Sequence, residues 1–231
     1  MTRTFATLFI PLCALACVQS KDTNSDDTGT NGTGSTGSTI YDIQTGVIAD
    51  EATVTLEDVL VSTAINLEGE GFFIQDPAGG EYSGIYVYLQ GSFTDLYLTV
   101  GDELTISGKV SEFYDFTELV VASDSDIEVT GTGTLSTTVV SSPSDWEPYE
   151  SVLVELQNQT VESCPDSYGE ATLSEGIDID DSLYVFEVEA GAVYSSIVGA
   201  LTYNYGEYKL LPRDQDDLTL ETAGTACQSD T

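Results

Sequence analysis

Apolar and polar positions alternate along most of the chain after Ile40, and this period of two predicts a protein built from β-strands. The stretch Gly84–Leu89 is an example, because its aliphatic residues alternate with two tyrosines. Successive side chains of a strand point to opposite faces, so we expect the aliphatic set inside and the tyrosines outside. The pattern predicts five strands in the first half of this region: Thr53–Val61, Gly71–Gln75, Gly84–Leu89, Leu104–Val110 and Leu119–Val121.

Turn-forming residues separate these strands, as in the sequence DPAGG at Asp76–Gly80. Two segments, Ser92–Leu98 and Ser144–Val152, are the expected short helices. The second half of the region repeats the scheme with four further predicted strands: Ser151–Leu156, Ser182–Val188, Ser196–Leu201 and Tyr208–Leu211.

Two segments of this region, Ile106–Val129 and Ile197–Leu220, align without a gap. A repeat as long as a small domain predicts two copies of one β unit, and short strands with glycine at the bends suit a small closed barrel. We therefore predict an all-β fold of two tandem barrels, residues 40–133 and 134–221, followed by a tail, residues 222–231. The identical pairs are Ile106/Ile197, Gly108/Gly199, Tyr114/Tyr205, Leu119/Leu210 and Asp126/Asp217.

Residues 1–16 have the proportions of a signal peptide, because Arg3 precedes an apolar run that is too short to span a bilayer. The run ends in the sequence Ala14-Leu15-Ala16-Cys17, which resembles the lipobox of bacterial lipoproteins. In that family cleavage occurs before the cysteine, so the resemblance implies that Cys17 carries the lipid. A plain secretory signal cut after Ala16 is the open alternative.

Residues 17–39 are rich in Ser, Thr, Gly, Asn and Asp, and such a segment has nothing to bury. This composition predicts a flexible linker between a lipid anchor and the folded body. Val18, rather than Asp, follows Cys17, which in enterobacterial lipoproteins goes with the outer membrane. We expect a cell-envelope protein in the outer membrane, facing the periplasm or the cell surface.

Two thiols, Cys164 and Cys227, are left once Cys13 leaves with the signal and Cys17 is lipidated. Two thiols in an exported protein most simply form one disulfide. The chain-entropy model gives a loop of about 60 residues roughly 4 kcal/mol of stabilisation.

The chain carries 40 acidic and five basic residues, for a formal net charge of −35. Binding to nucleic acid depends on Lys and Arg that neutralise phosphates, so nucleic acid and anionic lipid surfaces are unfavourable partners. Histidine is absent, which excludes Ser-His-Asp and Cys-His catalysis and removes the commonest zinc ligand. Carboxylate-only glycosidase chemistry is open in principle, but nothing in the sequence marks a particular pair of acids. We expect no enzymatic activity and no cofactor other than calcium.

Several motifs resemble, in the same order, the OB-fold-like region of secreted bacterial nucleases. This resemblance implies that both units are OB-like barrels. It does not imply nuclease activity, because the metal-binding acids and catalytic histidines of that family lie in a downstream domain. The motifs are GFFIQDP at Gly71–Pro77, SGIYVY at Ser83–Tyr88, VGDEL at Val100–Leu104, SGKVSEF at Ser107–Phe113, YESVLV at Tyr149–Val154 and YKLLPR at Tyr208–Arg213.

OB folds bind ligands on one sheet face and its flanking loops. Exposed aromatic side chains there can stack on sugars or bases or dock against a partner, whereas the alternative is that they pack against the neighbouring unit. The candidates are Tyr86, Tyr88, Phe93 and Tyr97 in the first unit and Tyr203, Tyr205 and Tyr208 in the second.

Charged side chains supply two further candidates. Arg213 can bind a carboxylate or a phosphate of a ligand. The alternative is that it pairs with a nearby aspartate: Asp214, Asp216 or Asp217. Asp178, Asp180 and Asp181 are candidate calcium ligands because calcium prefers oxygen, although their spacing does not match an EF-hand and a solvated loop is the alternative.

These observations favour a non-catalytic cell-envelope lipoprotein that acts as a binding or scaffolding module for a protein or glycan partner. The alternative function follows from the resemblance to secreted nucleases. In it, the chain is an accessory nucleic-acid-binding module that uses aromatic stacking, with calcium bridging to phosphate.

Overall fold

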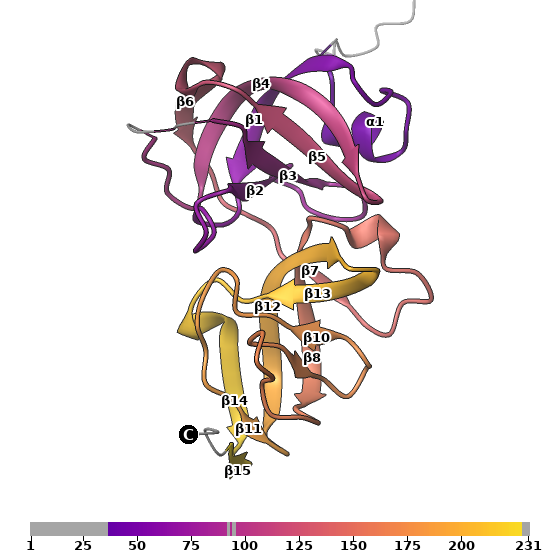
Figure 1. The fold of residues 1–231 in the computed structure, drawn as a ribbon, viewed down its shortest axis with the longest axis vertical. Coiled ribbons are helices and arrows are strands. Elements are labelled where there is room, and N and C mark those ends of the chain that lie inside the picture. Colours follow the sequence, from indigo (N-terminus) through magenta and orange to yellow (C-terminus); the bar gives the residue numbers. More distant parts are fainter. Residues whose placement is uncertain (1–36, 92, 94–95, 228–231) are drawn as a thin grey trace, which may run out of the picture. The chain divides into compact units, whose positions relative to one another are not determined.

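The computed structural model describes residues 37–91, 93 and 96–227 (Figure 1). These residues are mostly β, with two main sheets and few helices. The predicted signal peptide, the lipidation site at Cys17 and most of the predicted linker lie outside the described residues. Within the described residues, none of the helices is long and apolar enough to cross a membrane.

The first sheet follows the order β1-β2-β3-β5-β4-β6, and β1 also pairs with β4. Each strand from β1 to β5 therefore has two hydrogen-bonded neighbours among these five. The pair β3 and β5 is parallel, whereas the other pairs are antiparallel. The strands are β1 (Thr53–Val61), β2 (Gly71–Gln75), β3 (Gly84–Leu89), β4 (Asp102–Phe113), β5 (Phe116–Val121) and β6 (Ile127–Thr132).

The second sheet follows the order β7-β8-β12-β13-β10-β9, and β14 pairs with β12. An isolated bridge between Val161 and Leu173 links the chain just after β8 to the chain just after β9. A separate two-stranded sheet joins β11 (Glu189–Ala190) to β15 (Thr225–Ala226). The strands of the second sheet are β7 (Thr138–Val140), β8 (Leu153–Thr160), β9 (Ala171–Thr172), β10 (Asp178–Ile179), β12 (Val193–Asn204), β13 (Glu207–Leu211) and β14 (Leu218–Thr222).

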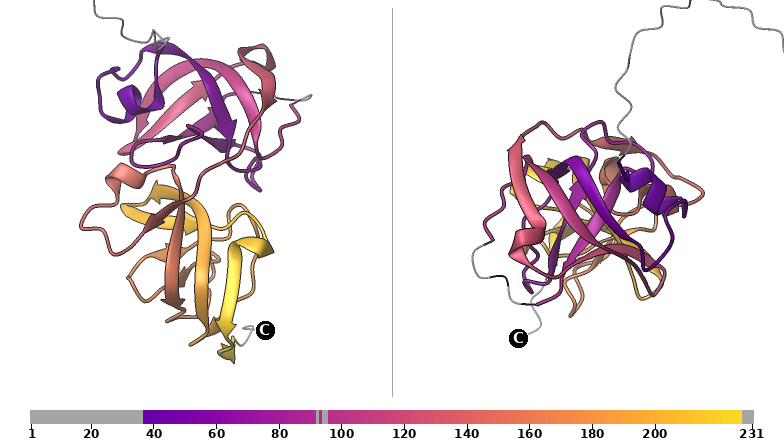
Figure 2. Two further views of the ribbon diagram at one scale, coloured as in Figure 1. Left: turned by 180° about the vertical axis from the view of Figure 1, so that it is seen from behind. Right: turned by 90° about the horizontal axis from the view of Figure 1, so that it is seen from above.

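The two aligned segments have matching secondary structure, and the two halves that contain them are called the first and second copy below. Extended backward, the alignment of the two segments places both ends of β4 on both ends of β12, which are the two longest strands (Figure 2). The short 3-10 helices η1 (Asp124–Asp126) and η3 (Gln215–Asp217) also coincide. The strand register is the same in both copies, because Val110 pairs with Leu119 and Leu201 pairs with Leu210 at the aligned positions.

Each copy has its own apolar core. In the first, the aliphatic residues of β3 are buried as the alternation predicted, together with Ile40 and Ile43 of α1 (Ile40–Gln44). In the second, residues of β8, β12 and β13 surround Leu173 and Ile177. A third cluster joins the two sheets, because Phe73 and Phe116 of the first copy pack with three residues of the second: Leu183, Ala200 and Leu211.

Three predicted elements differ in the structure. Ser182–Val188 forms no strand, although Leu183, Phe186 and Val188 are buried and the last two of them alternate with an exposed residue. The position beside β13 is taken by β10, so this segment has no strand partner. Ser144–Val152 contains only the 3-10 turn η2 (Glu147–Tyr149). In the expected helix Ser92–Leu98, the described residues are not helical.

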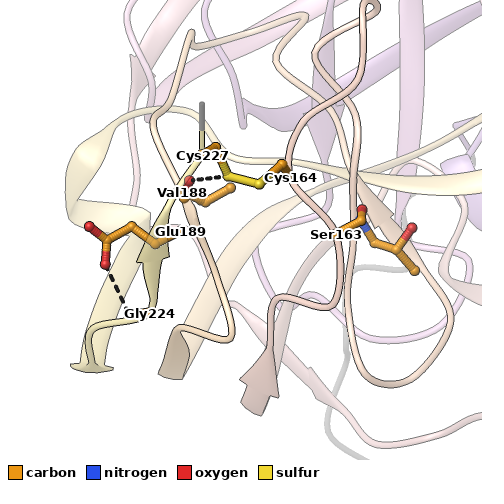
Figure 3. The surroundings of a disulfide bond; sticks show 7 residues. Ser163, Cys164, Val188, Glu189, Gly224 and Cys227 are labelled. Carbon is orange, nitrogen blue, oxygen red and sulfur yellow. Dashed lines mark hydrogen bonds between the residues drawn. A yellow bond between two sulfur atoms is a disulfide. The ribbon is translucent and has the colours of Figure 1, made fainter. Parts of the chain in front are cut away.

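Cys164 and Cys227 form the predicted disulfide (Figure 3). Their Cα atoms are 5.6 Å apart and the cysteines are separated by 63 residues in sequence. The bond lies beside the β11–β15 pair, where Cys227 Sγ is 3.3 Å from the carbonyl oxygen of Val188 and Glu189 accepts a hydrogen bond from the Gly224 amide. The disulfide therefore fixes the last described residues to the second copy.

Aligned glycines allow the close strand contacts of β4 and β12. A Cβ atom at Gly108 would lie 2.7 Å from Cγ of Leu119, and one at Gly199 would lie 2.6 Å from the carbonyl oxygen of Leu211. We expect Gly108→Ala to lower the free energy of unfolding by about 1–3 kcal/mol, because the strand pair has to separate. Gly131→Ala in β6 is the control, since its Cβ would meet only the carboxylate end of Glu103. Urea unfolding measures the stability of both variants. Equal losses in Gly108→Ala and Gly131→Ala would contradict the strand-contact explanation.

The disulfide gives a second stability prediction. We expect the double variant Cys164→Ser/Cys227→Ser to lose about 3–4 kcal/mol of unfolding free energy, because the bond closes a long loop in the unfolded chain. Urea denaturation of the oxidised protein, the reduced protein and the variant measures the loss. The reduced protein is expected to match the variant, and an unchanged midpoint after reduction would show that the bond has no effect on stability.

Candidate functional site

A recess of about 390 Å³ lies on the second copy, between the β9–β10 hairpin and the start of β13. The hairpin supplies one wall, β13 supplies another, and Trp146 comes from the segment that precedes β8. None of the described Lys and Arg residues lines the recess. The lining residues are Trp146, Thr172, Gly176, Ile177, Asp178, Glu207 and Tyr208.

Tyr208 is held in place from two directions. Its ring lies 4.7 Å, centroid to centroid, from the ring of Tyr203, and its hydroxyl donates a 2.5 Å hydrogen bond to Oε2 of Glu147. Burial raises the pKa of the Tyr208 hydroxyl, and the neighbouring carboxylate of Glu147 raises it further. The phenol therefore stays protonated and keeps donating this hydrogen bond at physiological pH.

The segment that carries Trp146 is fixed by contacts with the first copy. The carbonyl oxygen of Pro148 accepts a 2.6 Å hydrogen bond from the Tyr82 amide, and the hydroxyl of Tyr149 donates to Glu81 Oε1 at 3.1 Å. Trp146 itself is half-buried against the core of the second copy. Its ring is thus partly covered by protein, and its remaining surface lines the recess.

Glu150, at the end of the same segment, is a buried carboxyl group. The residue is 1% exposed, and its Oε1 accepts a 3.0 Å hydrogen bond from the Thr117 amide of β5. Its Oε2 is buried without a hydrogen-bond partner among the described residues. Burial raises the pKa of this carboxyl to about 8, and the charges of Glu147 and Glu112 act in the same direction, although the bond from Thr117 opposes them. The group is therefore mainly neutral at pH 7.

The sequence-predicted aromatic residues do not gather on one face. Tyr86 packs in the cluster between the sheets, 4.9 Å from the ring of Phe73 and 5.5 Å from that of Phe116. Burial raises the pKa of the Tyr86 hydroxyl. Tyr203 packs against the same cluster, so for both tyrosines the structure agrees with packing against the neighbouring unit.

The other aromatic candidates are scattered. Phe93 does not join the tyrosines of β3, because it packs against the core of the first copy. Tyr88 is half-buried, whereas Tyr97 is 86% exposed and Tyr205 is 98% exposed. Tyr208 is the one sequence-selected aromatic residue that lines the recess.

Arg213 is engaged inside the protein. Its guanidinium forms a bidentate pair with Asp217, through Nε at 2.8 Å and Nη2 at 2.7 Å, and its Nη1 lies 3.3 Å from the carbonyl oxygen of Ser62. The side chain joins the end of β13 to the segment after β1. This geometry agrees with the structural alternative, in which Arg213 pairs with a nearby aspartate.

The expected calcium ligands do not form a joint site. No group of three or more Asp, Glu, Cys or His side chains within residues 37–91, 93 and 96–227 is arranged to hold a metal ion. Asp180 instead accepts hydrogen bonds from the amide and hydroxyl of Ser182, and the carboxylate of Asp181 lies against Gly169. Asp178 lines the recess, apart from any such group. Among the described residues, Asp178, Asp180 and Asp181 are therefore not arranged as one metal-binding group.

Sequence analysis did not select Trp146, which lines the recess together with Tyr208. The available signal was its rarity, because Trp146 is the single tryptophan of the chain. Its place before β8 shows no strand alternation, so the pattern carried no information about its environment.

Comparison with known protein families and with curated protein sequences finds no match for this chain.

The buried carboxyl predicts a pH-dependent stability. Glu150 binds a proton more tightly in the folded chain than in the unfolded chain, where its pKa is near 4.5. Between these pKa values the folded state holds the extra proton, so stability is fully present below pH 4.5 and falls as the pH rises to about 8. We expect Glu150→Gln, which imitates the neutral group, to be more stable than the native chain at pH 9 by about 2–4 kcal/mol.

Urea unfolding at pH 5, 7 and 9 measures this difference. Glu128→Gln, an exposed acid on β6, is the matched control and is expected to follow the native pH dependence. If the Glu150 and Glu128 variants lose stability in parallel between pH 5 and pH 9, the burial of Glu150 does not cause the dependence.

Proposed function

We propose that this chain is a non-catalytic binding module of the cell envelope, made of two OB-like barrels and tethered through a lipidated Cys17. The cyclic pairing of β1 to β5, with β3 and β5 parallel, supports an OB-like barrel in the first copy. The bridge that links the ends of β8 and β9 supports the same arrangement in the second. The Cys164–Cys227 disulfide supports an exported location, because disulfides persist in oxidising compartments.

The partner is a protein or a glycan, and the recess carries this proposal. Trp146 and Tyr208 offer aromatic surface, while Thr172, Asp178 and Glu207 offer polar groups at the same place. Aromatic rings with a few polar groups are typical of ligand sites. Nucleic acid is the weaker candidate, because the lining contains acids and no base to neutralise a phosphate.

Tryptophan fluorescence gives a direct test, since Trp146 is the single tryptophan of the chain. We expect the mature protein to show no saturable response to single-stranded oligothymidylate at low salt, with or without calcium. A panel of neutral oligosaccharides and basic proteins is expected to contain at least one saturable ligand.

The binding is expected to be lost in Trp146→Ala, measured by calorimetry, and unchanged in the control Tyr97→Ala, which removes an exposed ring outside the recess. Tight oligothymidylate binding that requires Trp146 would replace the proposal with the nucleic-acid function. Ligand binding that survives Trp146→Ala would move the site away from the recess.

A further inference from the structure

The lining of the recess also indicates which chemical group it binds. We propose that the recess binds the ammonium group of an organic cation, namely the basic side chain of a protein partner. This inference rests on the proposed function, because it takes the recess as the binding site. It goes further by assigning the charge and shape of the ligand.

The aromatic rings are of the kind that attracts cations. Trp is the strongest cation–π partner and Tyr is the next, because the face of each ring is electron-rich. The hydroxyl of Tyr208 donates to the carboxylate of Glu147, and this bond moves negative charge toward the phenol ring. Both residues are half-buried and line the recess, so a cation that contacts either ring there loses part of its hydration and gains ring contact instead.

The charges around the rings have one sign. Asp178 and Glu207 line the recess, and Glu147 lies behind Tyr208. The nearest cation along β13, Lys209, is 3% exposed and is bound to Glu170 in a salt bridge. Lys209 lies opposite Asp178 in the β10–β13 pair, but its charge is balanced by Glu170. Among the described residues, neither Asp178 nor Glu207 forms a salt bridge.

These features distinguish a cation from other ligands of similar size. An anion would be repelled by the lining acids and by the net charge of −35. A neutral sugar can stack on the rings, but it leaves the carboxylates without a counter-charge. An alkylammonium group suits both the rings and the carboxylates, because its carbon atoms contact the rings while its charge faces the acids.

The test compares choline with 3,3-dimethylbutan-1-ol, its neutral isostere, by Trp146 fluorescence of the mature full chain. The two compounds have the same shape, so a difference in affinity reports the charge. We expect a saturable response to choline, with an affinity about tenfold or more above that of the isostere. Equal affinities, or a choline response that does not saturate by about 50 mM, would overturn the proposal.

Three variants place the effect in the recess. Glu207→Gln is expected to weaken choline binding about fivefold, whereas Glu128→Gln, which removes the same charge from an exposed position on β6, leaves it unchanged. Tyr208→Phe keeps the ring but loses the bond to Glu147, and is expected to weaken binding about threefold. Equal losses in the two Glu→Gln variants would show that choline responds to net charge and not to a site.

The source of the cation is distinguished by further probes. Nα-acetyl-lysine-methylamide, its trimethylated form and putrescine are titrated in the same assay. A response to the lysine compounds at least equal to that of choline supports a basic side chain of a protein, whereas a response to choline or putrescine alone would indicate a free amine and overturn the proposal. A saturable response to neutral oligosaccharides with none to any cation would overturn this inference and leave the proposed function standing.

Discussion

The hydrogen bond between the Thr117 amide and the Glu150 carboxyl is the constraint on which the candidate site depends. A carboxylate that loses water without a paired cation is costly, so the buried group favours its neutral form. Glu150 ends the segment that contains Trp146 and Glu147, and β8 begins three residues later. By fixing Glu150 against β5, the bond sets where Trp146 lies and where Glu147 meets Tyr208. The recess therefore depends on a contact that lies outside its own lining.

A second buried polar contact supports this junction. The side chain of Gln75, fully buried at the end of β2, accepts a hydrogen bond from the Leu153 amide at 2.8 Å and donates to the Ser136 carbonyl at 2.7 Å. Apolar packing between the sheets is non-directional, whereas these bonds require one geometry. The cluster around Phe73 supplies apolar burial between the sheets, and the two polar side chains favour the arrangement in which it is buried.

Sequence pattern predicted the strands better than the site. The limits of β1, β2 and β3 agree with the predicted ranges, because alternation, β-branched residues and turn residues all change at the same positions. Ser182–Val188 shows the limit of this method, since alternation reports which side chains are buried and not whether the backbone has a strand partner. The exposure of Tyr86 could not be predicted for a related reason. Its ring faces outward from β3, but a neighbouring sheet covers it.

The recess follows from a difference between the two copies. In the first copy β2 and β3 have five and six residues, and Tyr86 of β3 packs in the cluster between the sheets. The corresponding β9 and β10 have two residues each and are joined by a tight turn in which Gly176 has a φ of +77°. No atom lies within 4 Å of where a Cβ of Gly176 would be, so this end of the hairpin is open. The β9–β10 hairpin is too short to cover Tyr208, whereas the longer β2 and β3 cover the core of the first copy. Trp146 lies beside Tyr208 at the surface that the hairpin leaves uncovered. The same fold thus uses one copy mainly for packing and leaves the other with an aromatic surface available to a ligand.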